Sequence, residues 1–303
     1  GSIWIGSKRN GLTRIKDGVS TIYSVAKDSV RTIIDDHIND LTTDKIGNLW
    51  IATNGGLQVY NPRMNSFSSY TRENGKLSTN SITCLFYKQD ATENNLLIGT
   101  SEGLIILNLS TTEKKVYTGN STNLKSFTNN YITQIFQDSR GLIWVGTREG
   151  LNILNLETDE LDYLTEKQGL CNNNICGIAE DKNHCIWVTT SRGVSRIVIQ
   201  RNHEEGVNNY GLYNYTTADG LQSNEFNMGS ILTKQDGEVL LGGLYGVNWV
   251  LHRDGAEKEE LPRVMLTQLF IGEEEVLAGH EYHGNVILNQ ALNETSRIDL
   301  SHS

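Results

Sequence analysis

A short pattern of hydrophobic and polar positions recurs six times along the chain. Each copy has an anchor residue, usually tryptophan, between apolar neighbours, followed in most copies by glycine or alanine, a short polar stretch and another glycine. The anchors are Trp4, Trp50, Leu97, Trp144, Trp187 and Leu240. Successive anchors lie 43 to 53 residues apart, about the length of one four-stranded β-propeller blade. The repeat therefore predicts an all-β propeller with six visible blades of about 47 residues.

The copy around Trp144 indicates the strands that one blade should contain. The expected strands, from the ring axis outward, are 132–136, 142–147, 151–156 and 161–164. We expect a turn at 138–141, because an aspartate side chain accepts local backbone hydrogen bonds and glycine can adopt positive φ. The same plan recurs from Ile38 and from Ile175. The tryptophans, each between apolar neighbours, are predicted to wedge between adjacent blades rather than to bind a ligand.

The first copy begins at its second strand, because no inner strand precedes Trp4. An open sheet edge exposes unpaired backbone groups. We therefore expect an upstream segment to supply the missing strand, with a strand from the tail at 286–303 as the alternative.

Composition mainly excludes some classes of partner and site. The 29 glycines against 2 prolines fit many hairpin turns between short strands. The 36 acidic and 26 basic residues give a formal charge of −10, which provides no Lys/Arg surface for a phosphate backbone, so no nucleic-acid partner is expected. The four cysteines lack zinc-binding spacing, and we expect idle or buried thiols, with a bridge between Cys171 and Cys176 as the alternative.

The sequence offers few candidates for catalysis. Neighbouring carboxylates occur at 35–36, 204–205 and 273–275, but adjacency in sequence does not direct two carboxyls at one substrate atom. The histidines form no recognisable zinc pair, and the nearest candidate, 280–283, is expected to be a loop. We therefore expect no enzyme activity, no metal and no cofactor, and a propeller lyase or glycosidase is the weaker alternative.

The complete repeat, from Asn130 through Leu151, is Asn-x-Ile-x-x-Ile-x-x-Asp-x-x-Gly-x-x-Trp-x-Gly-Thr-x-x-Gly-Leu. This pattern resembles the two-component regulator propeller repeat. The resemblance implies a periplasmic sensor region of a hybrid two-component receptor, of the kind found in Bacteroides, that detects polysaccharide breakdown products. After the acidic stretch at 257–260, residues 262–273 are similar to the start of the immunoglobulin-like domain that follows the propeller in such receptors.

The resemblance also implies domain boundaries and partners. Residues 1–258 would form the propeller, as part of a seven-bladed ring, and 259–303 the start of a truncated immunoglobulin-like domain. Receptors of this family carry two such propellers before that domain, a membrane helix and a kinase, so the chain resembles the end of the second propeller. The implied partners are an oligosaccharide, a second copy in a homodimer within an inner-membrane receptor, and the remainder of the receptor chain.

The candidate binding surface lies where loops converge on one face of the ring. In a propeller, these loops are the turns between second and third strands and the links into each inner strand. Asn80, Asn130, Asn174 and Asn224 precede inner strands at equivalent places, so backbone capping explains them as well as ligand contact does. Variable positions with guanidinium, amide, carboxylate or tyrosine groups suit a hydroxyl-rich or acidic sugar better. The predicted ligand-binding residues are Arg9, Asn54, Glu102, Arg148, Glu149, Arg192 and Tyr245.

Two binding functions remain open from the sequence. The first is recognition of an oligosaccharide, relayed toward a histidine kinase outside this chain. The second is a protein-interaction or dimerisation scaffold with no ligand of its own. An exposed apolar patch on the ring face favours the scaffold, whereas a polar cleft with aromatic walls favours a sugar.

Overall fold

The computed structural model describes residues 1–25, 33–89, 94–119, 126–201, 208–250, 268–282 and 284–290. The chain divides into two compact units, Gly1–Leu251 and His252–Ser303. The predicted domain boundary at 258, the acidic stretch and residues 262–267 lie outside the described residues, so the boundary and the immunoglobulin-like assignment stay predictions. Within the second unit, β23 (Phe270–Ile271) pairs with β24 (Glu274–Glu275), and β25 (Glu281–Tyr282) pairs with β26 (Asn285–Val286).

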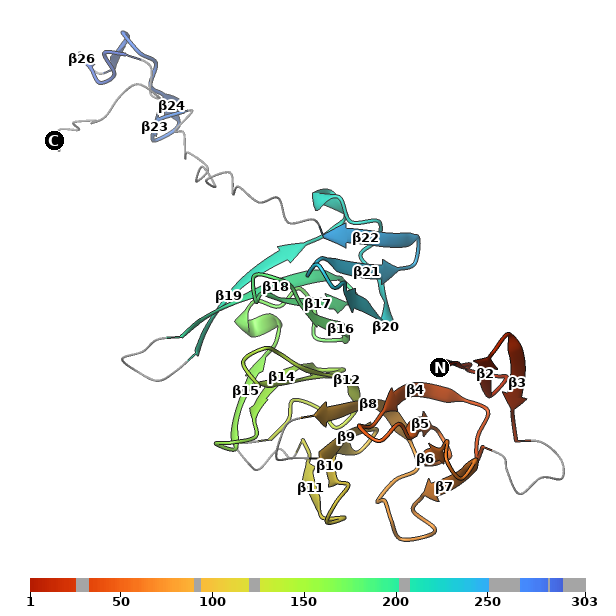
Figure 1. Cartoon of the computed structure of the whole chain (residues 1–303). Helices are drawn as coiled ribbons and strands as arrows, with labels where there is room; N and C mark the ends of the chain where they lie inside the picture. Colours follow the sequence, from red (N-terminus) through yellow and green to blue (C-terminus); the bar gives the residue numbers. More distant parts are fainter. Residues whose placement is uncertain are drawn as a thin grey trace. The chain divides into compact units, whose positions relative to one another are not determined.

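The first unit is a β-propeller of six antiparallel sheets that follow one another in chain order (Figure 1). Blade 1 comprises β1 (Ser2–Gly6), β2 (Leu12–Lys16) and β3 (Val19–Tyr23). Blade 2 comprises β4 (Ile38–Thr43), β5 (Leu49–Thr53), β6 (Gly56–Asn61) and β7 (Ser66–Tyr70). Blade 3 comprises β8 (Ile82–Gln89), β9 (Asn94–Thr100), β10 (Gly103–Asn108) and β11 (Lys114–Tyr117).

The remaining blades repeat this plan. Blade 4 comprises β12 (Ile132–Gln137), β13 (Ile143–Thr147), β14 (Gly150–Asn155) and β15 (Glu160–Leu164). Blade 5 comprises β16 (Ile175–Glu180), β17 (Ile186–Thr190), β18 (Gly193–Arg201) and β19 (Asn208–Tyr215). Blade 6 comprises β20 (Phe226–Thr233), β21 (Val239–Gly243) and β22 (Gly246–Val250). The links after blades 4 and 5 contain short 3-10 turns, η1 (Glu166–Gln168) and η2 (Thr217–Asp219). The predicted all-β fold and strand order are confirmed, including a first blade that starts with the strand of Trp4.

Adjacent blades approach closely through the small residue that follows the anchor by two positions. A Cβ atom on Gly146 of β13 would lie 2.8 Å from Ile175 Cγ2, on the inner strand of the next blade. On Gly99 of β9, it would lie 2.9 Å from Ile132 Cγ2. Because only a small residue tolerates this distance, the glycine in the repeat sets the spacing between blades. The core forms at these junctions: Trp144 and Ile175 belong to one buried cluster with residues of blades 4 and 5.

Three tryptophan anchors are buried and bound to the aspartate six residues earlier. The indole Nε1–H of Trp144 donates to Asp138 Oδ2 at 3.0 Å. The pairs Trp50–Asp44 and Trp187–Asp181 have the same bond at 3.0 and 2.7 Å. The predicted structural role of these tryptophans is confirmed. Trp4 is half-buried and packs edge-on against Tyr60 of blade 2, with ring centroids 5.1 Å apart.

The cysteines behave as the sequence suggested. All four are free thiols; Cys84, Cys176 and Cys185 are buried and Cys171 is half-buried. The alternative of a bridge between Cys171 and Cys176 is not formed in the structure.

Candidate functional site

The turns between second and third strands meet the links into the inner strands at one face, which we call the loop face. Backbone hydrogen bonds join the two sets within blades 3, 5 and 6. The N–H groups of Ser101, Ser191 and Leu244 donate to the carbonyl oxygens of Ser81, Asn174 and Glu225, at 3.2, 3.3 and 3.3 Å. These bonds confirm that the two loop sets lie together.

Buried threonines hold the backbone of four of these turns. Thr147 Oγ1 donates to the Gly150 carbonyl at 2.8 Å and accepts from the Glu149 N–H at 3.1 Å. Thr53, Thr100 and Thr190 make the same pair of bonds. Gly150 has φ +142°, and a Cβ there would lie 3.0 Å from the Leu164 carbonyl oxygen. The turn backbone is therefore fixed, while the side chains that it carries extend into solvent.

The predicted binding residues lie on turns of all six blades, all exposed at the loop face. The guanidinium carbon of Arg148 lies 3.6 Å from the centroid of the Tyr131 ring, on the link into β12. Asn54 Oδ1 accepts from Asn39 Nδ2 at 2.9 Å. Arg9, Glu102, Glu149, Arg192 and Tyr245 extend from their own turns. The structure therefore pairs Arg148 with Tyr131 and Asn54 with Asn39, but does not gather the seven residues into one pocket.

The loop face differs in character at blade 6. Leu244 and Tyr245 are 54% and 81% exposed, whereas the corresponding turns of the other blades present polar side chains. The Tyr245 backbone is held by its N–H bond to Gln222 Oε1 at 2.8 Å. This turn is therefore an exposed apolar feature beside a polar face.

The recurring link asparagines cap the backbone, which is the role that the sequence left open. The Oδ1 atoms of Asn80, Asn130 and Asn224 accept from the N–H groups of Arg72, Gly119 and Thr217 at 2.7, 2.6 and 2.8 Å. The prediction that Asn174 is their equivalent was wrong by one position. Asn173 is the residue that accepts such a bond, from the Glu166 N–H at 2.7 Å, because the cap lies two residues before each inner strand.

Two residues that contact the predicted set were not among the predicted binding residues. Tyr131 supports Arg148, and Asn39 binds both Asn54 Oδ1 and the Ile82 carbonyl of the next blade, the latter at 2.7 Å. A polar side chain at the second position of an inner strand was the available signal for Asn39.

An acidic residue is half-buried on an inner strand. Asp40 of β4 accepts from the Leu41 N–H and from the Leu85 N–H of the next blade, both at 2.8 Å. Burial raises the pKa of this carboxyl above its ordinary value despite the two bonds. Burial, and secondarily the Asp40 charge, also raises the pKa of the Cys84 thiol. Cys84 therefore stays protonated at neutral pH and is not an activated nucleophile.

One Ser–His–Glu cluster joins the turns between inner and second strands of blades 4 and 5. Ser139 Oγ donates to Glu180 Oε1 at 2.6 Å and lies 2.8 Å from His184 Nδ1. The same His184 nitrogen is 3.1 Å from Glu180 Oε1. A catalytic triad needs one ring nitrogen toward the serine and the other toward the acid. Because both partners share Nδ1, the cluster ties blade 4 to blade 5 and does not form a nucleophile and base.

Among the residues that the structure describes, no three His, Cys, Asp or Glu side chains gather as metal ligands. The described part of the chain also contains no helix that is long and apolar enough to cross a membrane. Of the carboxylate pairs considered above, 204–205 lies outside the described residues.

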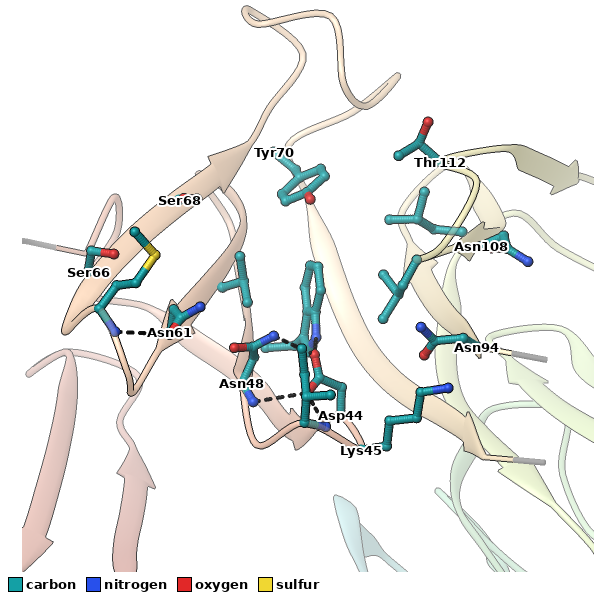
Figure 2. Close-up of a pocket in the computed structure, with 16 residues that line it drawn as sticks. Asp44, Lys45, Asn48, Asn61, Ser66, Ser68, Tyr70, Asn94, Asn108 and Thr112 are labelled. Carbon is teal, nitrogen blue, oxygen red and sulfur yellow. Dashed lines mark hydrogen bonds between the residues drawn. The ribbon is translucent and has the colours of Figure 1, made fainter. Parts of the chain in front are cut away.

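Two cavities lie between blades, at the strand ends remote from the loop face. The first, of about 290 Å³, lies between blades 2 and 3 (Figure 2), and Trp50 is one of the residues that line it. The second, of about 490 Å³, lies at the equivalent place between blades 3 and 4. None of the seven predicted binding residues lines either cavity.

The repeats match a known family. Residues 32–55, 126–149 and 169–192 match the family described as two component regulator propeller. Each matched segment runs from the link before an inner strand to the turn after the second strand. No curated protein sequence matches the chain significantly.

Solved structures share the fold. The extracellular domain of the hybrid two-component system BT3049 from B. thetaiotaomicron is 18% identical, with a TM-score of 0.54 over 92% of this chain and 42% of its own. For BT4673 from the same organism the values are 20%, 0.54, 91% and 42%. The virginiamycin B lyase of Staphylococcus aureus, an enzyme, is 12% identical, with a TM-score of 0.56 over 80% of this chain and 74% of its own.

This chain spans less than half the length of the two B. thetaiotaomicron domains. At these identities the structural likeness shows the fold alone. Three segments, which together make up less than half of the chain, match the two component regulator propeller family.

Proposed function

We propose that the chain is the extracytoplasmic ligand-recognition part of a two-component signalling receptor and that its loop face binds an oligosaccharide. The repeat family and the fold shared with extracellular domains of two-component systems support the receptor class. The observation that carries the ligand proposal is Arg148, which is exposed on a threonine-braced turn with its guanidinium carbon 3.6 Å from the centroid of the Tyr131 ring. A guanidinium presents its N–H donors as a planar fork, which suits a sugar carboxylate or a pair of hydroxyls.

The surroundings of Arg148 supply complementary groups. Glu149 on the same turn and Glu102 on the preceding blade offer acceptors for sugar hydroxyls, and Arg192 on the following blade offers a second cation. Because the threonines already fix these turns, binding orders few backbone groups and loses little conformational entropy. An acidic oligosaccharide long enough to cross neighbouring blades is therefore the ligand class that we propose.

Signalling requires more than binding. A ligand shifts an equilibrium only if it has different affinities for two arrangements of the receptor. We propose that the arrangement involves a homodimer in the periplasm and that the residues after the propeller relay the change toward a kinase in the rest of the receptor. In this proposal the propeller itself binds without catalysis.

A second candidate role, a protein-interaction scaffold, is favoured by one observation. The Leu244–Tyr245 turn is apolar and largely exposed at the edge of the loop face. Tyrosine and leucine exposed together on a rigid turn form a suitable anchor for a protein partner. The scaffold role and the sugar-binding role use different blades, so they are compatible.

Calorimetric titration of the whole chain with neutral and uronate-containing oligosaccharides tests the proposal. We expect a uronate oligosaccharide to bind, and the Arg148→Ala and Arg192→Ala variants to bind it about tenfold more weakly, because each loses a charge-assisted hydrogen bond. Arg63→Ala is the matched control, since Arg63 is exposed on the β6–β7 turn, away from the loop face. Equal affinity of all variants would show that the sugar binds elsewhere. Absence of binding across the panel would contradict the proposed ligand class for this chain.

A further inference from the structure

The cavity between blades 2 and 3 exists because a leucine occupies a junction position that is aromatic at the preceding junction. Tyr60 of β6 and Leu107 of β10 hold equivalent places in the strand register. Between blades 1 and 2, the Tyr60 ring fills the junction, with its centroid 5.1 Å from that of Trp4 and 5.0 Å from that of Phe67. Leu107 has no ring, and a space of about 290 Å³ remains beside Trp50. We call this space the blade 2–3 cavity.

The wall of the blade 2–3 cavity is apolar on one part only. Val59, Leu107 and Trp50, which is 3% exposed, form the apolar part. Asparagine and serine side chains of both blades occupy much of the rest (Figure 2). Such a wall suits a ligand that has both C–H surface and several polar groups. The volume is at the lower end of the range of about 300–1,000 Å³ for small-molecule sites, which favours a compact ligand over a long oligomer.

Two amide groups at this cavity have donors that the protein does not use. Asn61 Oδ1 accepts from the Arg63 and Met64 N–H groups at 2.9 and 3.1 Å, and Asn108 Oδ1 holds its own turn in the same way. In the described part of the chain, no acceptor binds the Nδ2 group of either side chain. Figure 2 shows Asn61 and Asn108 on opposite sides of the cavity. Amide donors are therefore available to a ligand from two sides.

A row of hydroxyl groups on β7 is also available. Ser66, Ser68 and Tyr70 alternate along this strand, so their side chains share one face of the sheet, and all three line the cavity. Within the described residues, none of the three hydroxyl groups makes a hydrogen bond. Because a hydroxyl can both donate and accept, this row matches a ligand that carries several hydroxyls of its own.

The charges at the cavity favour an anionic ligand. Asp44 is in the lining, but its Oδ1 accepts from the Ile46 and Asn48 N–H groups and its Oδ2 accepts from Trp50 Nε1. Both oxygens of this carboxylate therefore already have partners within the protein. Lys45, also in the lining, is exposed, and its ammonium group has no ion pair in the part of the chain that the structure describes. The cavity thus offers a cation to a ligand carboxylate.

We propose that the blade 2–3 cavity binds a small hydroxy acid, a compact molecule with one carboxylate and several hydroxyls. The carboxylate pairs with Lys45 Nζ, and the hydroxyls bond to the hydroxyl row of β7 and to the amides of Asn61 and Asn108. The carbon chain lies against Val59 and Leu107. None of the seven predicted binding residues of the loop face lines this cavity, so the site does not depend on the proposed oligosaccharide binding.

Ligand-observed NMR titration of the whole chain with three six-carbon probes tests the chemistry of this ligand. Gluconate has the carboxylate and the hydroxyls, hexanoate lacks the hydroxyls, and sorbitol lacks the carboxylate. We expect gluconate to bind at least about tenfold more tightly than either of the others, because only gluconate satisfies both Lys45 and the hydroxyl row. No binding of gluconate, or equal binding of the three probes, would overturn the proposal.

Lys45→Met tests the cation. It should weaken gluconate binding at least about fivefold and leave the weaker sorbitol binding unchanged, because methionine retains an apolar stem and lacks the charge. Lys182→Met is the matched control, since Lys182 follows Asp181 in the equivalent turn of blade 5 and lines neither cavity. Arg148→Ala should bind gluconate normally. A loss in Arg148→Ala instead of Lys45→Met would place gluconate at the loop face and contradict the proposed site.

Two further variants test the cavity itself. Asn61→Asp keeps the turn acceptor but removes the Nδ2 donor, so it should weaken gluconate binding at least about fivefold. Asn155→Asp is its control, since Asn155 Oδ1 accepts from the Glu157 and Thr158 N–H groups in the same way and lines neither cavity. Ser68→Phe places a ring in the cavity and should abolish binding. Equal losses in Asn61→Asp and Asn155→Asp, or normal binding by Ser68→Phe, would refute the site. Where Ser68→Phe does not fold, the two asparagine variants decide the outcome.

Discussion

At the scale of single residues, the repeat is held by a pair of side chains that depend on each other. Asp138 is buried, and its Oδ1 accepts from the Arg140 and Leu142 N–H groups while its Oδ2 accepts from Trp144 Nε1. Where the anchor is Leu240, the residue six positions earlier is Lys234 instead of aspartate. A buried indole N–H and a buried carboxylate each need the other, so the two positions change together within this chain.

This pairing predicts the cost of removing Asp138. Asp138→Ala should lower the free energy of unfolding by about 3 kcal/mol, because it leaves the indole and turn donors without their acceptor. Urea denaturation followed by tryptophan fluorescence and circular dichroism measures the change. Asp236→Ala is the control, in the equivalent turn of blade 6, where Asp236 bonds only to exposed groups; it should change the stability far less, because exposed ion pairs contribute little. Similar losses in both variants would refute the pairing.

At the scale of elements, a carboxyl links two inner strands. Asp40 in β4 accepts from the Leu85 N–H in β8 at 2.8 Å, and burial raises its pKa. The folded state therefore holds the proton more tightly than the unfolded state. Asp40 contributes full stability when it is protonated, below its unfolded pKa of about 3.9, and loses that contribution as pH rises through the folded pKa.

The pH dependence of stability follows from this sign. The free energy of unfolding of the unaltered chain, relative to Asp40→Asn, should decrease as pH rises from about 4 toward neutrality. Denaturant titrations of both proteins at closely spaced pH values measure the difference, in which the other titrating groups cancel. A difference that grows with pH would mean that the two backbone hydrogen bonds outweigh burial and lower the pKa.

At the scale of the whole molecule, each blade depends on its neighbour. Inner strands of consecutive blades contact one another, and the buried clusters combine residues from both sides of each junction. The contact between Gly146 and Ile175 is one of the points where two blades meet most closely. A substitution at such a point should destabilise both blades, because packed interiors transmit strain.

Gly146→Ala should therefore destabilise blades 4 and 5 together. The added Cβ would lie 2.8 Å from Ile175 Cγ2 and 2.9 Å from Thr133 Oγ1, and overpacking of this kind costs about 1–3 kcal/mol. Hydrogen exchange followed by mass spectrometry should show faster exchange in both β13 and β16. In the control Gly211→Ala, the added Cβ meets no atom nearer than 3.8 Å, so exchange should not change. Faster exchange limited to β13 would contradict the coupling between blades.

The sequence predicted most of the fold because the residue types of the repeat have fixed structural roles within a blade. Each of them meets a requirement of one blade: the aspartate, the tryptophan, the small residue and the final glycine. At the loop face, Thr147 bonds to the Gly150 carbonyl, and Gly150 has the positive φ that the turn needs. The sequence predicted the candidate site less well. It placed the seven residues on the correct loops but could not show that Arg148 rests on Tyr131, because that contact depends on the spacing between a turn and a link.

The sequence by itself determined the blades, their order and the face on which the loops gather, because these follow from local periodicity and turn chemistry. Only the tertiary structure decided which asparagine caps each link and where cavities remain between blades. Both depend on how far one segment extends beside another. Asn173 rather than Asn174 reaches the Glu166 N–H at the start of the same link, and the outer hairpin of blade 3 is shorter than that of blade 5, in which Tyr210 packs edge-on against Trp144. Such distances are set by the tertiary packing, and the repeat pattern does not specify them.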